Sequence, residues 1–172
     1  MIKYLILKIL NIFDFFHQRK IIKFLHKKGF KNFDIIFDVG AHKGESINLF
    51  LSNFKTASIY SFEASPITFK ILSDKIDYIR NKFKNSKIII ENYAIGSVKK
   101  KVSLKQLKES SSSTIRNLNE NSKYFKKKLF FLQGDKRSPF FKEVEVDQIR
   151  LSDYLVKNNI GSIDFLKIDT EG

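Results

Sequence analysis

Apolar residues recur near the start of the chain at the spacing of an amphipathic helix. One apolar stripe is formed by Ile2, Leu5, Ile6, Ile9, Phe13 and Phe16. Charged residues from Lys3 to Lys20 interrupt it and no small-residue cleavage site follows, so neither a transmembrane span nor a secretion signal is expected. We predict a helix over residues 1–28, within an N-terminal amphipathic segment of residues 1–30. Two interpretations stay open: the helix packs on the following domain, or residues 2–16 lie on a membrane surface.

From Asp34 onward, short apolar runs alternate with segments of helical spacing. The apolar runs predict strands at residues 35–39, 57–62 and 87–93. Between the first two, residues 45–54 carry apolar side chains at the spacing of a helix. After the second, Ser65 and Pro66 supply an N-cap and a first-turn proline for another helix. This order of strands and helices predicts a parallel sheet with right-handed crossover connections.

The second half of the chain is less regular. Residues 98–104 predict a strand of an excursion from the sheet, and residues 143–151 alternate apolar and polar side chains as a further strand. Ser152 is expected to cap a short helix that ends at Lys157. The apolar run at residues 163–169 predicts another buried strand.

Length and composition limit the chain to one globular domain. A chain of 172 residues suffices for one sizeable core, and 42% hydrophobic residues argue against disorder. We assign residues 31–172 to an α/β domain with a Rossmann-like, doubly wound, mostly parallel sheet, made of four core strands and a β excursion. Cysteine is absent and the three histidines are scattered, so we expect neither a disulfide nor a metal site. Together with the lack of a secretion signal, this favours a cytoplasmic protein.

A formal net charge of +14 raises the question of a polyanionic partner. The lysines are spread along the whole chain, which favours solvated faces over a dedicated groove, and we expect no specific nucleic-acid partner. The alternative is a non-enzymatic, basic membrane- or polyanion-binding module. Its candidate contacts are the lysine runs at residues 99–101 and 126–128.

The strongest chemical signal lies at the turn between the first strand and the first helix of the domain. Gly40 and Gly44 allow a tight turn and a close approach of the backbone to a ligand, and Asp38 precedes them. This Gly-x-x-x-Gly spacing differs from the three-glycine pattern that receives a dinucleotide pyrophosphate. Asp38 would repel a pyrophosphate and favour a cationic, amino-acid-like ligand, directly or through water. A nicotinamide-dependent oxidoreductase is therefore the weaker functional alternative. The alternative without a ligand is an ordinary tight turn between strand and helix.

Three further strand ends carry candidate residues. Glu63 follows the second strand, where a carboxylate can accept hydrogen bonds from both ribose hydroxyls, although a solvated loop carboxylate is the alternative. After the third strand, Asn92 can orient a ligand or cap the strand end, and Ala94 is small enough for a planar base to lie against it. Asp169 and Glu171 follow the last strand, where one carboxylate can act as general base or both can anchor a loop.

Four segments in order resemble the FkbM-type methyltransferase family. They are FDVGAHKGES at 37–46, YSFEASP at 60–66, NYAIG at 92–96 and DFLKIDTEG at 164–172. The resemblance implies S-adenosylmethionine as cofactor and methyl transfer to a hydroxyl of a small molecule or saccharide. It also implies these roles: the loop around the methionine moiety for Asp38, Gly40, Ala41 and Gly44, the ribose for Glu63 with its neighbour Ala64, the adenine side for Asn92 and Ala94, and an acidic catalytic pair for Asp169 and Glu171.

This sequence departs from the family pattern at two points. His42 stands where the family more often has asparagine. The family pattern also continues beyond the glycine that matches Gly172, through a helix and three strands. We therefore expect a fragment of a longer product, a natural truncation being the alternative, and an open sheet edge with an apolar face.

Overall fold

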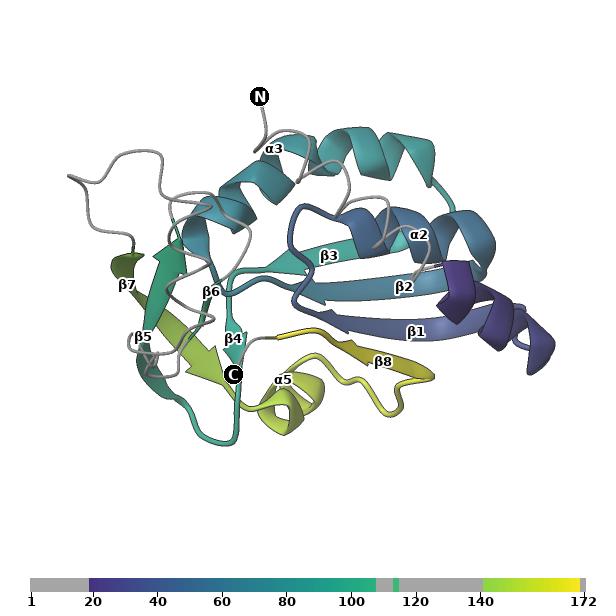
Figure 1. The fold of residues 1–172 in the computed structure, drawn as a ribbon. Coiled ribbons are helices and arrows are strands. Elements are labelled where there is room, and N and C mark those ends of the chain that lie inside the picture. The colour runs from purple at the N-terminus through teal and green to yellow at the C-terminus, as the bar shows by residue number, and fades with distance from the viewer. Residues whose placement is uncertain (1–18, 108–112, 115–140, 171–172) are drawn as a thin grey trace, which may run out of the picture. The chain divides into compact units, whose positions relative to one another are not determined.

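A computed structural model describes residues 19–107, 113–114 and 141–170 of the chain (Figure 1). Residues 19–30 belong to one compact unit and the remaining described residues to another. In the first unit, residues 19–27 form a helix, which confirms part of the predicted N-terminal helix. Gly29 closes it in the left-handed conformation, with φ 88°, and the Phe30 amide donates to the Leu25 carbonyl. The apolar stripe predicted over residues 2–16 lies outside the described residues.

The second unit contains the predicted parallel sheet. Its strands are β1 (Asn32–Val39), β2 (Lys55–Phe62), β3 (Lys87–Glu91) and β8 (Phe165–Ile168). They lie in the order β3-β2-β1-β8, and all neighbours are parallel (Figure 1). β8 is shorter than the predicted run at 163–169; just before it, the Asp164 carboxylate accepts the amides of Asp34 and Ile35, at 2.6 and 2.8 Å.

Three helices cover this sheet on opposite faces. α2 (Glu45–Asn53) and α3 (Pro66–Lys82) lie on one face, and α5 (Leu151–Lys157) lies on the other (Figure 1). The predicted start of α3 is confirmed, because the Ser65 hydroxyl accepts the Thr68 amide and proline occupies the first turn. The predicted cap of α5 is wrong: Arg150 is the N-cap and the helix begins at Leu151, two residues earlier than a helix capped by Ser152, so Ser152 already lies inside its first turn.

The predicted excursion is a second sheet. β4 (Ala94–Ile95), β7 (Phe141–Ile149), β5 (Lys100–Leu107) and β6 (Ser113–Thr114) lie in the order β4-β7-β5-β6. β4 is parallel to β7, and the other pairs are antiparallel. β5 starts later than predicted because Val98 lies in the turn before it, where its carbonyl accepts the Gln148 side-chain amide at 2.8 Å. The Rossmann-like α/β class with a mostly parallel central sheet is confirmed.

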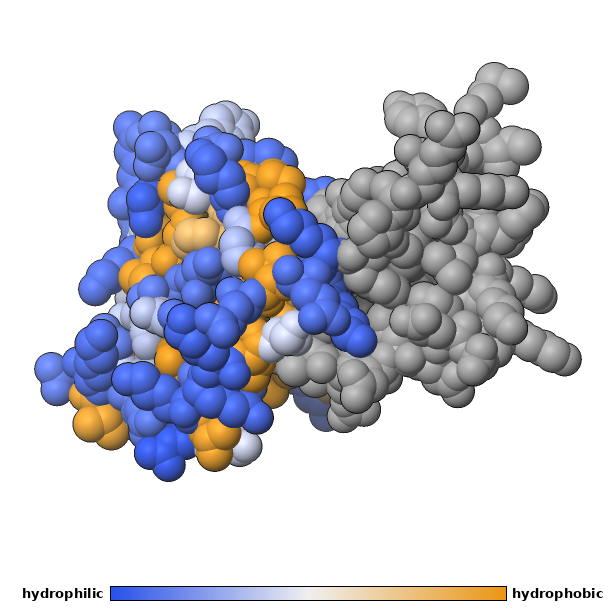
Figure 2. Space-filling view, turned by 90° about the vertical axis from the view of Figure 1, so that its left-hand side faces the viewer, coloured by the Kyte–Doolittle hydropathy of each residue, from blue (hydrophilic) through white to orange (hydrophobic). Residues whose placement is uncertain are grey.

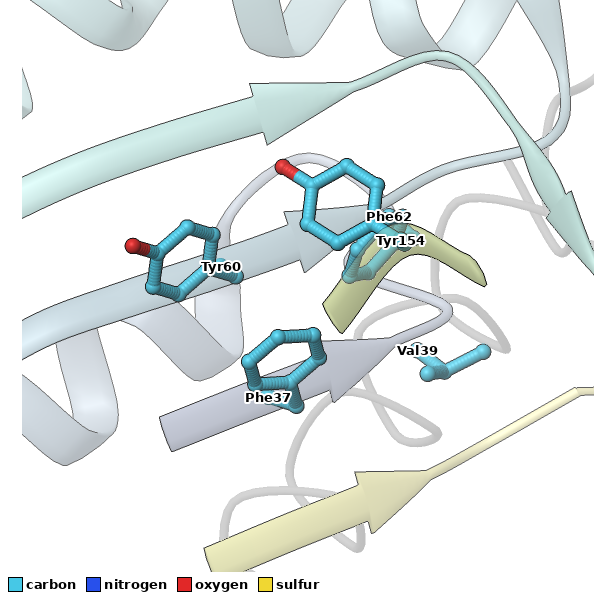
Figure 3. Packing of buried hydrophobic residues seen from close by; sticks show 5 residues of the cluster. All are labelled: Phe37, Val39, Tyr60, Phe62 and Tyr154. Atoms are coloured by element: carbon cyan, nitrogen blue, oxygen red, sulfur yellow. The ribbon is translucent and has the colours of Figure 1, made fainter. Parts of the chain in front are cut away.

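The α5 face of the sheet carries an aromatic core (Figure 3). Its buried members are Phe37, Val39, Tyr60, Phe62 and Tyr154. Phe37 stacks on Tyr60, and Phe62 meets Tyr154 edge to face, each pair at 5.0 Å between ring centroids. The Tyr154 hydroxyl donates to the Glu91 carboxylate at 2.9 Å; burial, followed by this hydrogen bond, raises the pKa of Tyr154.

One edge of the parallel sheet carries exposed apolar side chains. β8 lies at an edge of the described sheet, and its side chains Leu166 and Ile168 are 41% and 66% exposed, which matches the expected apolar edge.

Hydrophilic side chains cover much of the described surface in Figure 2, with hydrophobic areas between them. Lys99–Lys101 are exposed, whereas the run at 126–128 lies outside the described residues. No helix within the described ranges is long and apolar enough to cross a membrane.

Candidate functional site

The strands of the parallel sheet end in one row. Val39 lies opposite Phe62 on one side and Ile168 on the other, and Phe62 lies opposite Glu91. The residues that follow these ends are Gly40, Glu63, Asn92 and Asp169. Ligands of open α/β sheets bind outside the carboxyl ends of the strands. The fold therefore brings four candidate segments, far apart in the sequence, to the edge where such a ligand would bind.

The loop after β1 needs glycine at both predicted positions. Gly40 has φ 85°, and a Cβ atom there would lie 2.1 Å from the backbone oxygen of Asp169. Its amide and that of Ala41 both donate to the Phe62 carbonyl, at 2.9 and 3.0 Å, which fixes the loop to β2. Gly44 caps α2 with φ 88°, and a Cβ atom there would lie 2.9 Å from Leu72 Cδ1 of α3. Gly40 thus permits the contact between the loop after β1 and the end of β8, and Gly44 permits the contact between the same loop and α3.

His42 explains one departure from the family pattern. Its backbone is left-handed, with φ 49°, and its amide donates to Glu63 Oε2 at 2.8 Å. Histidine and asparagine are both enriched in this region among non-glycine residues. The histidine therefore meets the backbone requirement that asparagine would meet.

The Glu63 side chain, which follows β2, is buried and accepts a backbone amide on each carboxylate oxygen. Its side chain is only 7% exposed, and its second oxygen, Oε1, accepts the Ser65 amide at 2.9 Å. Burial raises the pKa of Glu63, and the hydrogen bonds from the two amides partly oppose this rise. Each oxygen of a carboxylate can accept two hydrogen bonds, so each keeps capacity for one further donor. The carboxylate thus ties the β1 and β2 loops together and keeps acceptor capacity on both oxygens.

Asn92 and the two candidate alanines lie beside Glu63. The Asn92 side-chain amide donates to the carbonyls of Glu63 and Ala64, at 2.7 and 3.2 Å, and thereby holds the turn after β2. Ala94 is buried in the cluster of the second sheet, and Ala64 packs against the same cluster. The structure brings these residues together; their contact with a planar base stays a prediction.

Asp38 is buried completely on the α2 face of β1. One of its oxygens accepts the Ser46 hydroxyl at 2.5 Å, and the other accepts the Lys167 ammonium at 2.9 Å. Both oxygens are therefore bonded to groups of the protein itself. The predicted contact of Asp38 with a cationic ligand stays a prediction, and in this arrangement a lysine of the protein already neutralises the carboxylate.

Lys167 is the residue that sequence reasoning missed. It lies on β8 directly opposite Asp38, and its ammonium also donates to the Gly40 carbonyl at 3.2 Å. Its side chain is 24% exposed. The available signal was a single lysine inside the apolar run at 163–169.

The acidic pair after β8 is described in part. The Asp169 amide donates to the Val39 carbonyl at 2.9 Å, which continues the ladder between β1 and β8. Its side chain is 79% exposed, and Oδ2 lies 3.6 Å from the Lys167 ammonium. Glu171 lies outside the described residues.

An open hollow lies at the opposite, amino-terminal end of β1 and β2. It is lined by Lys31, Leu51 and Lys55, among others, and contains no candidate residue.

Comparison with known proteins identifies the domain. The family model of the methyltransferase FkbM domain matches residues 38–172, a segment that starts at Asp38 and contains all the candidate residues. No curated protein and no solved structure matches the chain. Because the matched segment is most of the sequence, the chain belongs to the methyltransferase FkbM domain family.

Proposed function

We propose that this chain binds S-adenosylmethionine at the carboxyl ends of its parallel strands and transfers the methyl group to a hydroxyl of a small molecule or saccharide. Membership in a methyltransferase family supports methyl transfer in general. The observation that carries the cofactor assignment is the buried Glu63 carboxylate, which follows β2, lies beside the glycine loop and is held by one backbone amide on each oxygen.

The residues present fit this cofactor. A ribose offers two neighbouring hydroxyl donors, and Glu63 keeps one acceptor site on each oxygen. Gly40 has no side chain at the point where the loop after β1 meets the end of β8. Ala64 and Ala94 give small apolar side chains near the turn that Asn92 holds. These features support a nucleoside at the strand ends, with the ribose at Glu63.

When bound, the cofactor would supply a methyl group on a positively charged sulfur: the acceptor oxygen would bond to the methyl carbon as the carbon–sulfur bond breaks, with the neutral thioether S-adenosylhomocysteine as leaving group. The task of the protein is to hold the acceptor in line with the methyl group and to take up the hydroxyl proton. In this proposal the proton goes to the acidic pair Asp169 and Glu171. The choice of a small-molecule or saccharide acceptor comes from the family resemblance. The proposal includes a cytoplasmic location; for residues 2–16, contact with a membrane surface is the alternative to packing on the domain.

Titration of the chain with S-adenosylhomocysteine by calorimetry tests the cofactor assignment. We expect saturable binding that weakens at least about 100-fold in Glu63→Ala, because two hydrogen bonds to a charged group are lost. Glu145→Ala removes an exposed carboxylate of the same type on β7 and is expected to bind like the wild type. Circular dichroism verifies that each variant is folded. A folded wild-type chain that does not bind, or equal binding by Glu63→Ala, would refute the proposal.

A further inference from the structure

We propose that Lys167 and Asp169 together hold the amino-acid end of the methyl donor: the ammonium of Lys167 binds the donor carboxylate, and the carboxylate of Asp169 binds the donor ammonium. This inference rests on the proposed function and specifies which side chains bind one part of the cofactor. It gives Asp169 a binding role, which would leave proton removal to Glu171.

The first reason is that Asp38 is already neutralised. The carboxylate is 0% exposed, and its two oxygens accept hydrogen bonds from Ser46 and Lys167. Because this carboxylate has no exposed surface, a ligand ammonium could reach it only by displacing Lys167, whose ammonium would then lose its charged partner. The groups that bind the charged amino-acid end of the donor are therefore expected among the more exposed side chains next to Asp38.

The second reason is the position of the Lys167 ammonium. Asp38 and the Gly40 carbonyl fix it at the start of the glycine loop, at 2.9 and 3.2 Å. An ammonium has three N–H groups. Among the described residues only these two acceptors lie within hydrogen-bond distance, so the third N–H can serve a ligand. The side chain keeps 24% exposure, which is compatible with such a contact.

The third reason is the pairing of opposite charges. The Asp169 carboxylate lies 3.6 Å from the Lys167 ammonium and is 79% exposed, while its backbone is fixed by the hydrogen bond to Val39. An α-amino acid carries its ammonium and its carboxylate on one carbon atom. Such a zwitterion can lie against the Lys167–Asp169 pair with each charge facing its opposite. A methionine-type end group of the donor has this chemistry, whereas its adenosine part does not.

Two ligands separate this subsite from the rest of the cofactor site. S-adenosylhomocysteine carries the amino-acid end, and 5′-methylthioadenosine has the same nucleoside and thioether without it. We expect Asp169→Asn and Lys167→Met to weaken S-adenosylhomocysteine about tenfold or more in calorimetric titrations, as the loss of one charge-assisted hydrogen bond predicts. The affinity of both variants for 5′-methylthioadenosine should stay within about twofold of the wild type.

Further variants keep the test decisive. Lys167→Met leaves the buried Asp38 carboxylate without a cation, which can prevent folding. If the single variant does not fold, the double variant Asp38→Asn/Lys167→Met is titrated in its place. Lys167→Arg restores the charge and should recover part of the selective loss. Equal weakening of both ligands would show a structural role only and would overturn the inference, as would unchanged binding in Asp169→Asn. A wild-type chain that binds neither ligand overturns the proposed function itself and this inference with it.

Discussion

Replacement of Gly40 by alanine should destabilise the domain more than the same replacement of Gly44 or Gly161. The residue has φ 85°, a conformation in which an L-residue is less stable than glycine by about 1–2 kcal/mol. The new methyl group would also lie 2.1 Å from the Asp169 backbone oxygen. Because this neighbour is backbone, a side-chain rotation cannot relieve the collision.

The second contribution follows from the ladder between β1 and β8. To reach van der Waals distance, the end of β8 must move away from the loop, and the hydrogen bond from the Asp169 amide to the Val39 carbonyl is then strained or lost. Such a bond contributes about 0.5–1.5 kcal/mol. We expect a total loss of about 1.5–3.5 kcal/mol in the free energy of unfolding. For a chain of this size, that corresponds to a fall of roughly 3–14 °C in Tm.

Two matched variants separate the backbone and steric contributions in urea unfolding followed by circular dichroism. Gly44→Ala has nearly the same φ, 88°, but its methyl group meets flexible side-chain ends at 2.9 and 3.2 Å, so the loss should be smaller, about 1–2.5 kcal/mol. Gly161→Ala has open space within 4 Å and no left-handed φ, and should change stability by at most about 0.5 kcal/mol. Equal stability of Gly40→Ala and Gly161→Ala would refute this account of the strand ends.

Two further predictions concern carboxylates beside the strand ends. Because burial raises the pKa of Glu63 above its ordinary value of 4.5, affinity for S-adenosylhomocysteine should fall as the pH is lowered through the raised pKa. The free energy of unfolding should fall as the pH rises through the same window, since the folded state binds the proton more tightly, and Glu63→Gln should lack both trends. Tyr154→Phe keeps the ring contacts but removes the 2.9 Å hydrogen bond to Glu91, so urea unfolding should show a loss of about 1–2 kcal/mol. An unchanged midpoint would mean that water replaces the phenol at Glu91.

Several elements could be predicted because their signals are local. Apolar runs and helical spacing placed β1, α2, β2, α3 and β3 in the correct order, and Ser65 with Pro66 located the start of α3. The glycines at 40 and 44 were assigned to a tight turn from their residue type alone, and both have positive φ. Local signals were weaker in the second half. Ser152 is a good cap by type, but α5 begins at Leu151, where the chain leaves β7.

The sequence by itself determined the order of elements, the family and the residues that follow each strand, because period and residue type are properties of short segments. Only the tertiary structure decided which of those residues meet. Lys167 bonds to Asp38 across 129 positions because β8 lies beside β1 in a register that places the two side chains on one face. Glu63 binds the His42 amide because the loops after β1 and β2 leave the sheet side by side. Strand neighbours and register arise from the packing of the whole sheet, so a local pattern does not contain them.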